Sequence, residues 1–295
     1  MKLAAIDIGS NAARLLITDV FLDKKKQPEF IKSNLVRVPL RLGFDVFETG
    51  EISATRESHL IETMKAYRSL LNAYEVKHLK ACATSAMRDA SNADRILKKV
   101  KKETGIEIEV ISGDIEAALI YETHIAEGLE KDILYVYIDV GGGSTELTFF
   151  LNGQIVFKQS FNIGTIRLLK QQVAETLWES MKETIKTQVK GAKKVMAIGS
   201  GGNINKVFSL SKRKEGKALS LALLRDYYKE MSSLSLQERM SAYKMREDRA
   251  DVIIPALLIY VNVLKWAGAN EILIPKIGLA DGLIHALYDE VIRSL

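Results

Sequence analysis

The chain has 295 residues, of which 47% are hydrophobic and 27% charged, with a formal net charge of +5. This composition excludes a disordered or fibrous protein and supplies enough apolar residues for the cores of two domains. Its single cysteine, Cys82, excludes an intramolecular disulfide. The longest apolar stretch, 252–264, has 13 residues and is too short to span a membrane. We therefore expect a cytoplasmic protein with no membrane partner.

The positive net charge mildly favours an anionic partner. Basic residues occur in short clusters, a pattern that usually belongs to solvated faces. The clusters lie at 24–26, 98–102, 193–194 and 212–214. No aromatic residues are interleaved with them to stack on bases, so we expect no nucleic-acid partner.

The first half of the chain alternates strands and helices. The predicted elements are, in order, two strands within 3–20, a strand-like continuation to about 42, a helix over 53–74, a buried strand over 77–86, a helix over 91–104, a strand over 106–112 and a helix that starts just beyond 113. Ser91 and Asp94 have the spacing of a capping box at the start of the helix over 91–104, and Gly105 ends that helix.

The second half repeats the opening arrangement. Its predicted elements are a strand over 133–140, strands within 146–164 with a turn at 152–153, a mostly helical remainder with strands at 194–199 and 271–275, and a final helix over 278–295. In both halves an apolar strand, an aspartate, one apolar residue, a glycine-containing turn and a second strand follow one another. The aspartates, Asp7 and Asp139, lie 139 − 7 = 132 positions apart. We predict domains 1–127 and 128–295, with the last helix a candidate to pack back on the first.

The two turns predict phosphate binding. A dinucleotide fingerprint would need a glycine loop that runs directly into a helix, whereas both of these turns join strands. A tight turn can direct several N–H groups into one concavity, where glycine lets a phosphate approach. One such turn alone is usually a plain hairpin. Two of them, each after an aspartate, predict a site for a chain of phosphates, with the carboxylates placed to hold Mg²⁺.

Eight segments spread over nearly the whole chain carry a family resemblance. They are AAIDIGSNAARLLI, VPLRLG, ATSAMRDASN, IEVISGDIEAALIY, IDVGGGSTEL, AIGSGGN, DRADVIIPA and LADGL. By identity, order and spacing they resemble the exopolyphosphatase and guanosine pentaphosphate phosphohydrolase (Ppx/GppA) family of the actin, hexokinase and Hsp70 superfamily. The resemblance, to the family's short form, implies an α/β fold of two ribonuclease H-like (actin-like) domains with a cleft between them, and a Mg²⁺-dependent phosphohydrolase.

The resemblance also implies residue roles. Glu116 would activate water and Arg88 would contact the substrate. An ionised carboxylate suits a base and is favoured in the first turn of a helix, although a glutamate there is more often only structural. The implied substrate-binding residues are Gly9, Ser10 and Asn11 in the first turn, Gly141, Gly142, Gly143, Ser144 and Thr145 in the second, Gly199, Gly201, Gly202 and Asn203 in a third loop, and Arg249, for which an ion pair is an equal alternative. The implied metal ligands are Asp139 first, with Glu146 and Asp7 in support.

Three positions depart from the family pattern. Ala12 replaces a serine, and Ile115 and Ala118 replace a glutamate and an arginine beside the catalytic glutamate, which could slow turnover or change the substrate. Three functions stay open: release of terminal orthophosphate from linear polyphosphate, conversion of guanosine pentaphosphate to the tetraphosphate, and non-catalytic sensing of phosphate chains or nucleotides. A kinase is a weaker fourth. The sequence specifies neither chain-length preference nor metal identity, and a homodimer rests on the resemblance alone.

Overall fold

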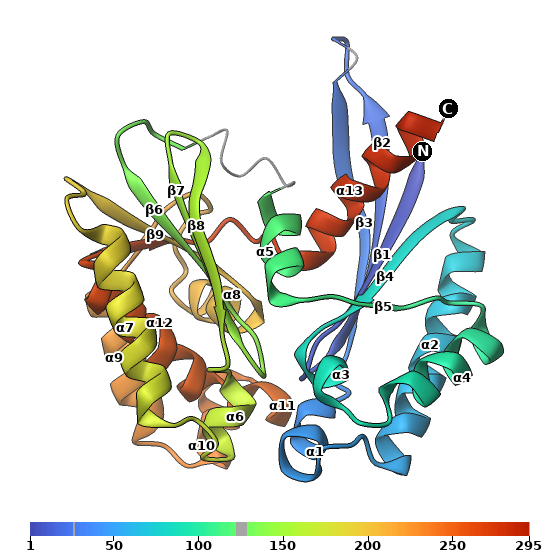
Figure 1. Cartoon of the computed structure of the whole chain (residues 1–295), viewed down its shortest axis with the longest axis horizontal. Coiled ribbons are helices and arrows are strands. Elements are labelled where there is room, and N and C mark those ends of the chain that lie inside the picture. Colours follow the sequence, from blue (N-terminus) through green and yellow to red (C-terminus); the bar gives the residue numbers. More distant parts are fainter. Residues whose placement is uncertain (26, 122–128, 295) are drawn as a thin grey trace. The chain divides into compact units, whose positions relative to one another are not determined.

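A computed structural model describes residues 1–25, 27–121 and 129–294 of the chain (Figure 1). The chain divides into two compact units. Unit 1 comprises Met1–Thr123 and Leu279–Leu295, and unit 2 comprises His124–Gly278. The domain boundary predicted at 127/128 lies outside the described residues.

Unit 1 is built on a five-stranded sheet with the order β3-β2-β1-β4-β5. Its strands are β1 (Lys2–Ile8), β2 (Ala13–Leu22), β3 (Pro28–Val38), β4 (His78–Ala83) and β5 (Glu109–Val110). The first three strands pair antiparallel, and β4 and β5 continue the sheet in parallel with β1. Its helices are α1 (Leu42–Thr49), α2 (Ala54–Ala73), α3 (Ser85–Asp89), α4 (Ala93–Thr104), α5 (Gly113–Tyr121) and α13 (Leu279–Ser294).

Helices cover both faces of this sheet. Helices α2 and α4 lie on one face, and α13 lies on the other beside α5 (Figure 1). The packing of α13 on the sheet follows from the alternation of side chains along β1. Leu3 and Ala5 point to the same face of the sheet, and Leu283 and Ile284 of α13 pack against them there. The final helix of the chain therefore completes the core of unit 1.

Unit 2 repeats the same sheet with one added edge strand, in the order β10-β11-β9-β6-β7-β8. Its strands are β6 (Leu134–Val140), β7 (Thr145–Leu151), β8 (Gln154–Phe161), β9 (Val195–Ser200), β10 (Leu219–Ser220) and β11 (Glu271–Leu273). Its helices are α6 (Thr165–Leu169), α7 (Glu175–Val189), α8 (Gly202–Leu210), α9 (Leu221–Ser232), α10 (Leu236–Tyr243), α11 (Glu247–Ala250) and α12 (Ile253–Ala267). In both units three antiparallel strands precede strands parallel to the first. This is the ribonuclease H-like (actin-like) arrangement, and the predicted fold class is confirmed.

Helix α12 is the central helix of unit 2. Its buried residues, among them Ile253, Leu257, Tyr260 and Leu264, belong to the main apolar cluster of that unit. By length and composition the helical stretch Glu247–Ala267 could also cross a membrane, with a mean hydropathy of 1.6 over an 18-residue window. Of that window, 61% is buried inside the protein, which is the pattern of a core helix.

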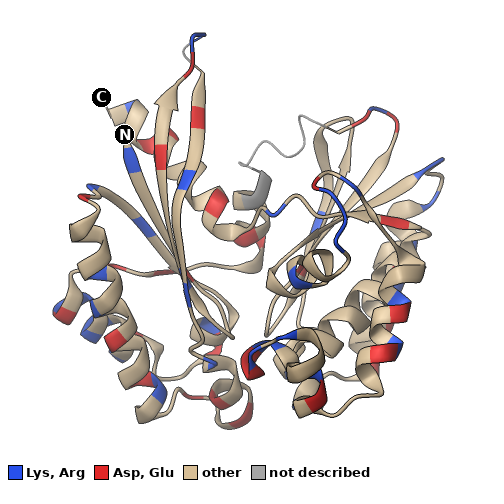
Figure 2. Ribbon diagram, turned by 180° about the vertical axis from the view of Figure 1, so that it is seen from behind, with Lys and Arg blue, Asp and Glu red and all other residues tan. Residues whose placement is uncertain are grey.

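Charged residues of both signs occur in both units (Figure 2). The basic clusters found in the sequence are solvent-exposed wherever they are described. Their exposed members are Lys24, Lys25, Lys98, Lys99, Lys101, Lys102, Lys193, Lys194, Lys212, Arg213 and Lys214. The interpretation of these clusters as solvated faces is confirmed.

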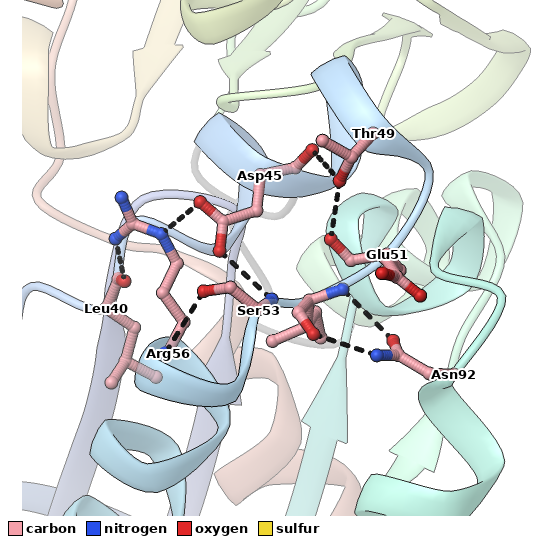
Figure 3. A network of polar contacts seen from close by, with 8 residues as sticks. Leu40, Asp45, Thr49, Glu51, Ser53, Arg56 and Asn92 are labelled. Carbon is pink, nitrogen blue, oxygen red and sulfur yellow. Dashed lines mark hydrogen bonds and ion pairs between the residues drawn. The ribbon is translucent and has the colours of Figure 1, made fainter.

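Some predicted element boundaries are wrong. The strand expected to 86 ends at Ala83, because α3 begins at Ser85, and the strand expected over 106–112 is only Glu109–Val110. The predicted capping box is absent, because α4 begins after Asn92 and that residue makes no side-chain cap. Instead Asn92 exchanges two hydrogen bonds with the backbone of Ile52, at 3.0 and 2.8 Å (Figure 3).

The strand-like pattern expected to continue to about 42 also ends early, and α1 follows it unpredicted. A tertiary network holds α1 in place (Figure 3). Asp45 accepts hydrogen bonds from the N–H of Ser53 at 3.1 Å and from Nε of Arg56 at 2.6 Å. Burial acts to raise the pKa of Asp45, but the hydrogen bonds from Ser53 and Arg56 outweigh it and lower that pKa. These contacts come from α2 and the residue before it, so no pattern within the sequence of α1 itself predicts that helix.

Candidate active site

The first turn joins β1 to β2 in unit 1. The Gly9 N–H donates to the Ala12 carbonyl at 3.0 Å, which closes the turn. Two further carbonyls of the turn accept hydrogen bonds from residues 41–43: the N–H of Gly43 donates to Ser10 O at 2.8 Å, and that of Arg41 donates to Asn11 O at 2.9 Å. Because these carbonyls accept hydrogen bonds from the protein, the N–H groups of the turn are directed outward, as an anion site requires.

Ser10, Arg88 and Glu116 lie at the same end of the unit 1 sheet. Strands β1 and β4 are parallel, so the turn after β1 and helix α3 after β4 emerge at one edge. There the hydroxyls of Ser10 and Ser85, both buried, are 2.8 Å apart. Nη1 of Arg88, one turn further along α3, donates to the Ile111 carbonyl at 2.9 Å.

Glu116 lies in the first turn of α5, as predicted, and α5 begins two residues after Ile111. The negative charge of Glu116 acts on Cys82, near the end of β4. Burial is the largest cause that raises the pKa of the Cys82 thiol, and the charges of Asp7 and Glu116 raise it further. The Arg88–Ile111 bond therefore links α3 to the segment that leads into the helix carrying Glu116.

Asp7 has a cation opposite it. It pairs in register with Arg14 on β2, whose Nη1 lies 2.7 Å from Asp7 Oδ2. Asp7 is buried and this ion pair neutralises it locally. Its role as a metal ligand is therefore poorly supported by the geometry.

The second turn, Gly141–Ser144, joins β6 to β7 in unit 2 and has the geometry of the first. The Gly141 N–H donates to Ser144 O at 2.9 Å, and these positions are those of Gly9 and Ala12 shifted by 132. The N–H groups of Thr165 and Ile166 donate to the carbonyls of Gly141 and Gly142, at 3.0 and 2.8 Å.

Further hydrogen bonds hold the second turn and the residue after it. Arg167 Nε donates to Gly143 O at 2.9 Å, and Thr145 Oγ1 donates to Ile163 O at 2.6 Å. Within the part of the chain that the structure describes, the N–H groups of Gly142, Gly143 and Ser144 donate to no protein acceptor. Their free hydrogens, and the missing Cβ atoms of the two glycines, suit a phosphate oxygen.

A pair of carboxylates flanks the second turn. Asp139 and Glu146 face each other across β6 and β7, at the positions that Asp7 and Arg14 occupy in unit 1. An acid thus replaces the cation found in the first unit. Glu146 is buried and accepts a hydrogen bond from Ser160 Oγ at 2.8 Å. Two like charges side by side favour a cation between them.

These two residues fit a divalent ion such as Mg²⁺, which takes one or two carboxylates and completes its shell with water and phosphate oxygens. Among the described residues no group of three or more His, Cys, Asp or Glu side chains is arranged so that it could hold a metal ion.

The third loop lies beside the carboxylate pair. Gly201 has φ of 104°, and a Cβ there would lie 3.3 Å from Asp139 Oδ1. A Cβ on Gly202 would lie 2.5 Å from Nη1 of Arg249, which also donates to Asn203 Oδ1 at 2.8 Å. Unit 2 therefore brings the second turn, Asp139, the third loop and Arg249 together.

Behind this loop Tyr260 of α12 donates to the Ser200 carbonyl. Complete burial and then the negative charge of Asp139 raise the pKa of Tyr260. The phenol therefore stays protonated and serves as a structural donor under the third loop.

Four residues at these turns were not predicted from the sequence to have a role: Arg41, Ser85, Gly164 and Arg167. Arg41 and Ser85 fall within the motif segments VPLRLG and ATSAMRDASN, but neither pattern assigns them a role. Gly164 and Arg167 lie outside all the motifs, and only their tertiary contacts with the second turn identify them.

Comparison with known proteins agrees with this geometry. The family model described as "Ppx/GppA phosphatase family" matches residues 23–291. The chain belongs to the Ppx/GppA phosphatase family. An exopolyphosphatase of Cytophaga hutchinsonii has a similar structure, with a TM-score of 0.84, 26% identity and 98% of both chains covered.

Curated proteins are also similar in sequence. The bifunctional 3-dehydroquinate synthase/phosphatase of Fusobacterium nucleatum is 36% identical over 175 residues, which cover 57% of this chain and 26% of that protein. Exopolyphosphatase 1 of Mycobacterium tuberculosis is 28% identical over 172 residues, covering 58% of this chain and 48% of that protein. The alignment thus spans half or less of the length of these relatives.

Proposed function

We propose that the chain is a phosphoanhydride hydrolase that releases terminal orthophosphate from linear polyphosphate. The second turn carries this proposal. Its carbonyls all accept hydrogen bonds from protein donors, three of its N–H groups have no protein acceptor among the described residues and remain for a ligand, and two carboxylates lie beside it. Membership of the Ppx/GppA family and the likeness to an exopolyphosphatase over the whole chain support polyphosphate as the substrate.

In the proposed reaction a water molecule attacks the terminal phosphorus. Its proton passes to the Glu116 carboxylate, the bond from phosphorus to the bridging oxygen breaks, and the shortened chain leaves with the bridging oxygen. The N–H groups of Gly142, Gly143 and Ser144 stabilise negative charge on the phosphoryl oxygens. Arg88 supplies planar donors to the same group of oxygens.

Asp139 and Glu146 would hold the metal ion, for which we propose Mg²⁺. When bound, the ion would neutralise phosphate charge and orient the substrate. Asp7 is left out of this set, because Arg14 already pairs with it at 2.7 Å. Gly9, Ser10 and Asn11 of the first turn, the third loop and Arg249 would contribute further donors to the substrate.

Orthophosphate release from polyphosphate tests the proposal. We expect the Glu116→Gln variant to lose about 10²- to 10⁴-fold in kcat, the usual contribution of a general base. Glu109→Gln is the matched control, because Glu109 is an exposed glutamate on β5, close in sequence to the base. Equal rates for the Glu116→Gln variant and the original protein would remove Glu116 from the mechanism.

The same preparation separates the alternatives. Faster release of phosphate from guanosine pentaphosphate than from polyphosphate would move the assignment to the pentaphosphate. Binding of either ligand with no turnover at saturating Mg²⁺ would support a sensor, a role in which the departures at Ala12, Ile115 and Ala118 would matter.

A further inference from the structure

Arg167 of helix α6 contacts the second turn and has no role in the reaction proposed for this site. Its backbone N–H donates to Gly142 O at 3.4 Å, and its side-chain Nε donates to Gly143 O at 2.9 Å. Glycine has no Cβ to restrict its backbone, so an outside contact must fix the orientation of this peptide.

Each carbonyl of the turn controls one N–H group. A trans peptide is planar, so the carbonyl of one residue and the N–H of the next point in opposite directions. The Gly141 carbonyl, held by Thr165, therefore sets the Gly142 N–H. The Gly142 carbonyl, held by Ile166, sets the N–H of the residue after it. By the same rule the Gly143 carbonyl sets the Ser144 N–H, and its donor is the Arg167 side chain.

Unit 1 has a donor at the corresponding place. Asn11 is the counterpart of Gly143, because 143 − 132 = 11, and its carbonyl accepts the Arg41 N–H at 2.9 Å. The two turns thus hold the same carbonyl by different means. In unit 1 the donor is a backbone N–H, which only a proline substitution would remove, whereas in unit 2 it is a side chain.

We propose that Arg167 is a positioning residue for the second phosphate turn: its Nε–H holds the Gly143 carbonyl so that the Ser144 N–H faces the bound phosphate. The inference rests on the proposed function of this turn. It assigns to Arg167 a hydrogen bond through Nε rather than a charge contact with the substrate.

Three substitutions separate these two roles. Arg167→Gln keeps an N–H donor on the atom bonded to Cδ, the place of Nε, and removes the charge. Arg167→Lys keeps the charge but places its donor one atom further away, and Arg167→Met keeps an apolar stem with neither. Arg225→Met is the control, because Arg225 is an exposed arginine of α9 in the same unit.

The readouts are kcat and KM for orthophosphate release, and the Kd of tripolyphosphate measured by calorimetry in a Glu116→Gln background. We expect Arg167→Met to lower kcat/KM and to weaken tripolyphosphate binding, each at least tenfold. We expect Arg167→Gln to recover most of both, with the control unchanged. Recovery by the glutamine distinguishes positioning from a general loss of stability, and melting temperatures of all variants accompany the rates.

Either of two results with the variants would overturn the proposal. Recovery by lysine with no recovery by glutamine would show that charge matters and the bond to Gly143 does not. Unchanged tripolyphosphate affinity in all three variants would show that the turn does not depend on Arg167. Failure of the proposed function is distinguishable, because it would appear as no turnover in the original protein while tripolyphosphate binding still ranks the variants. Absence of tripolyphosphate binding by the original protein would refute both.

Discussion

Gly164 packs directly against the second turn, and Gly164→Ala is the substitution that tests this packing. Its φ of −135° and ψ of 163° are open to any residue, so backbone strain is not the reason for glycine. The reason is space. A Cβ at this position would lie 2.3 Å from Gly142 O and 2.4 Å from the Gly143 carbonyl carbon.

The expected magnitude follows from these distances. Non-bonded heavy atoms pack at about 3.5 Å, so relief of the contact needs a displacement of about 1 Å. Overpacking of this kind costs about 1–3 kcal/mol of stability. A shift of about 1 Å in groups that position a substrate can cost about 10²-fold in rate. Gly164→Ala should therefore lose about two orders of magnitude in kcat/KM and several degrees in Tm.

The assay is orthophosphate release combined with thermal unfolding. Gly278→Ala is the control, since among the described residues the nearest atom to a Cβ there would be Ser200 Oγ, at an ordinary 3.9 Å. The argument is refuted if Gly164→Ala keeps its activity within about threefold and melts with the original protein, because the turn would then tolerate the displacement that the distances require.

Three further predictions concern other contacts. Glu57 is buried and accepts hydrogen bonds from Arg95 at 3.0 and 2.6 Å, which lower its pKa against the opposing effect of burial. The stabilisation that goes with a lowered pKa is fully present above the pKa of the unfolded state and is lost as the pH falls through the pKa of the folded state. Glu57→Gln should therefore lower the free energy of unfolding in urea by about 1 kcal/mol at pH 7, and by progressively less as the pH falls below the ordinary pKa of glutamate; an equal cost at every pH would contradict this. Gly282→Ala places a Cβ 2.0 Å from Leu119 O and should displace α5, lowering kcat by about 10²-fold; an unaltered kcat would show that α5 yields without moving its glutamate. Chelation should abolish phosphate release, and Glu146→Gln should raise the Mg²⁺ concentration for half-maximal activity about tenfold or more; activity in excess chelator would exclude this metal role.

The turns were predictable because their signals are local. A strand, an aspartate, a glycine-containing bend and a second strand occupy consecutive residues, and they recur 132 positions later at Asp139. Alternation and turn chemistry suffice to find such hairpins. The role proposed for Glu116 rests on the family resemblance, since a glutamate in the first turn of a helix is common for structural reasons alone.

The supporting contacts were not predictable because they are tertiary. Arg167 follows the second turn by more than twenty residues. Its hydrogen bond to Gly143 depends on the position of α6 in the fold, which the path of β8 determines. Helix α1 was missed for a similar reason: Arg41 precedes it with φ of 56° and no side-chain cap, so the usual start signal is lacking. The difference between Asp7 and Asp139 also depends on tertiary structure. Strand register places Arg14 opposite Asp7 and Glu146 opposite Asp139.

The most direct test of the account is a crystal structure of the Glu116→Gln variant with tripolyphosphate and Mg²⁺. The account predicts phosphate oxygens on the N–H groups of Gly142, Gly143 and Ser144, a metal ion on Asp139 and Glu146, and the substituted side chain at position 116 within reach of a water beside the terminal phosphorus. Phosphate bound away from the second turn, or position 116 remote from every phosphate, would contradict it.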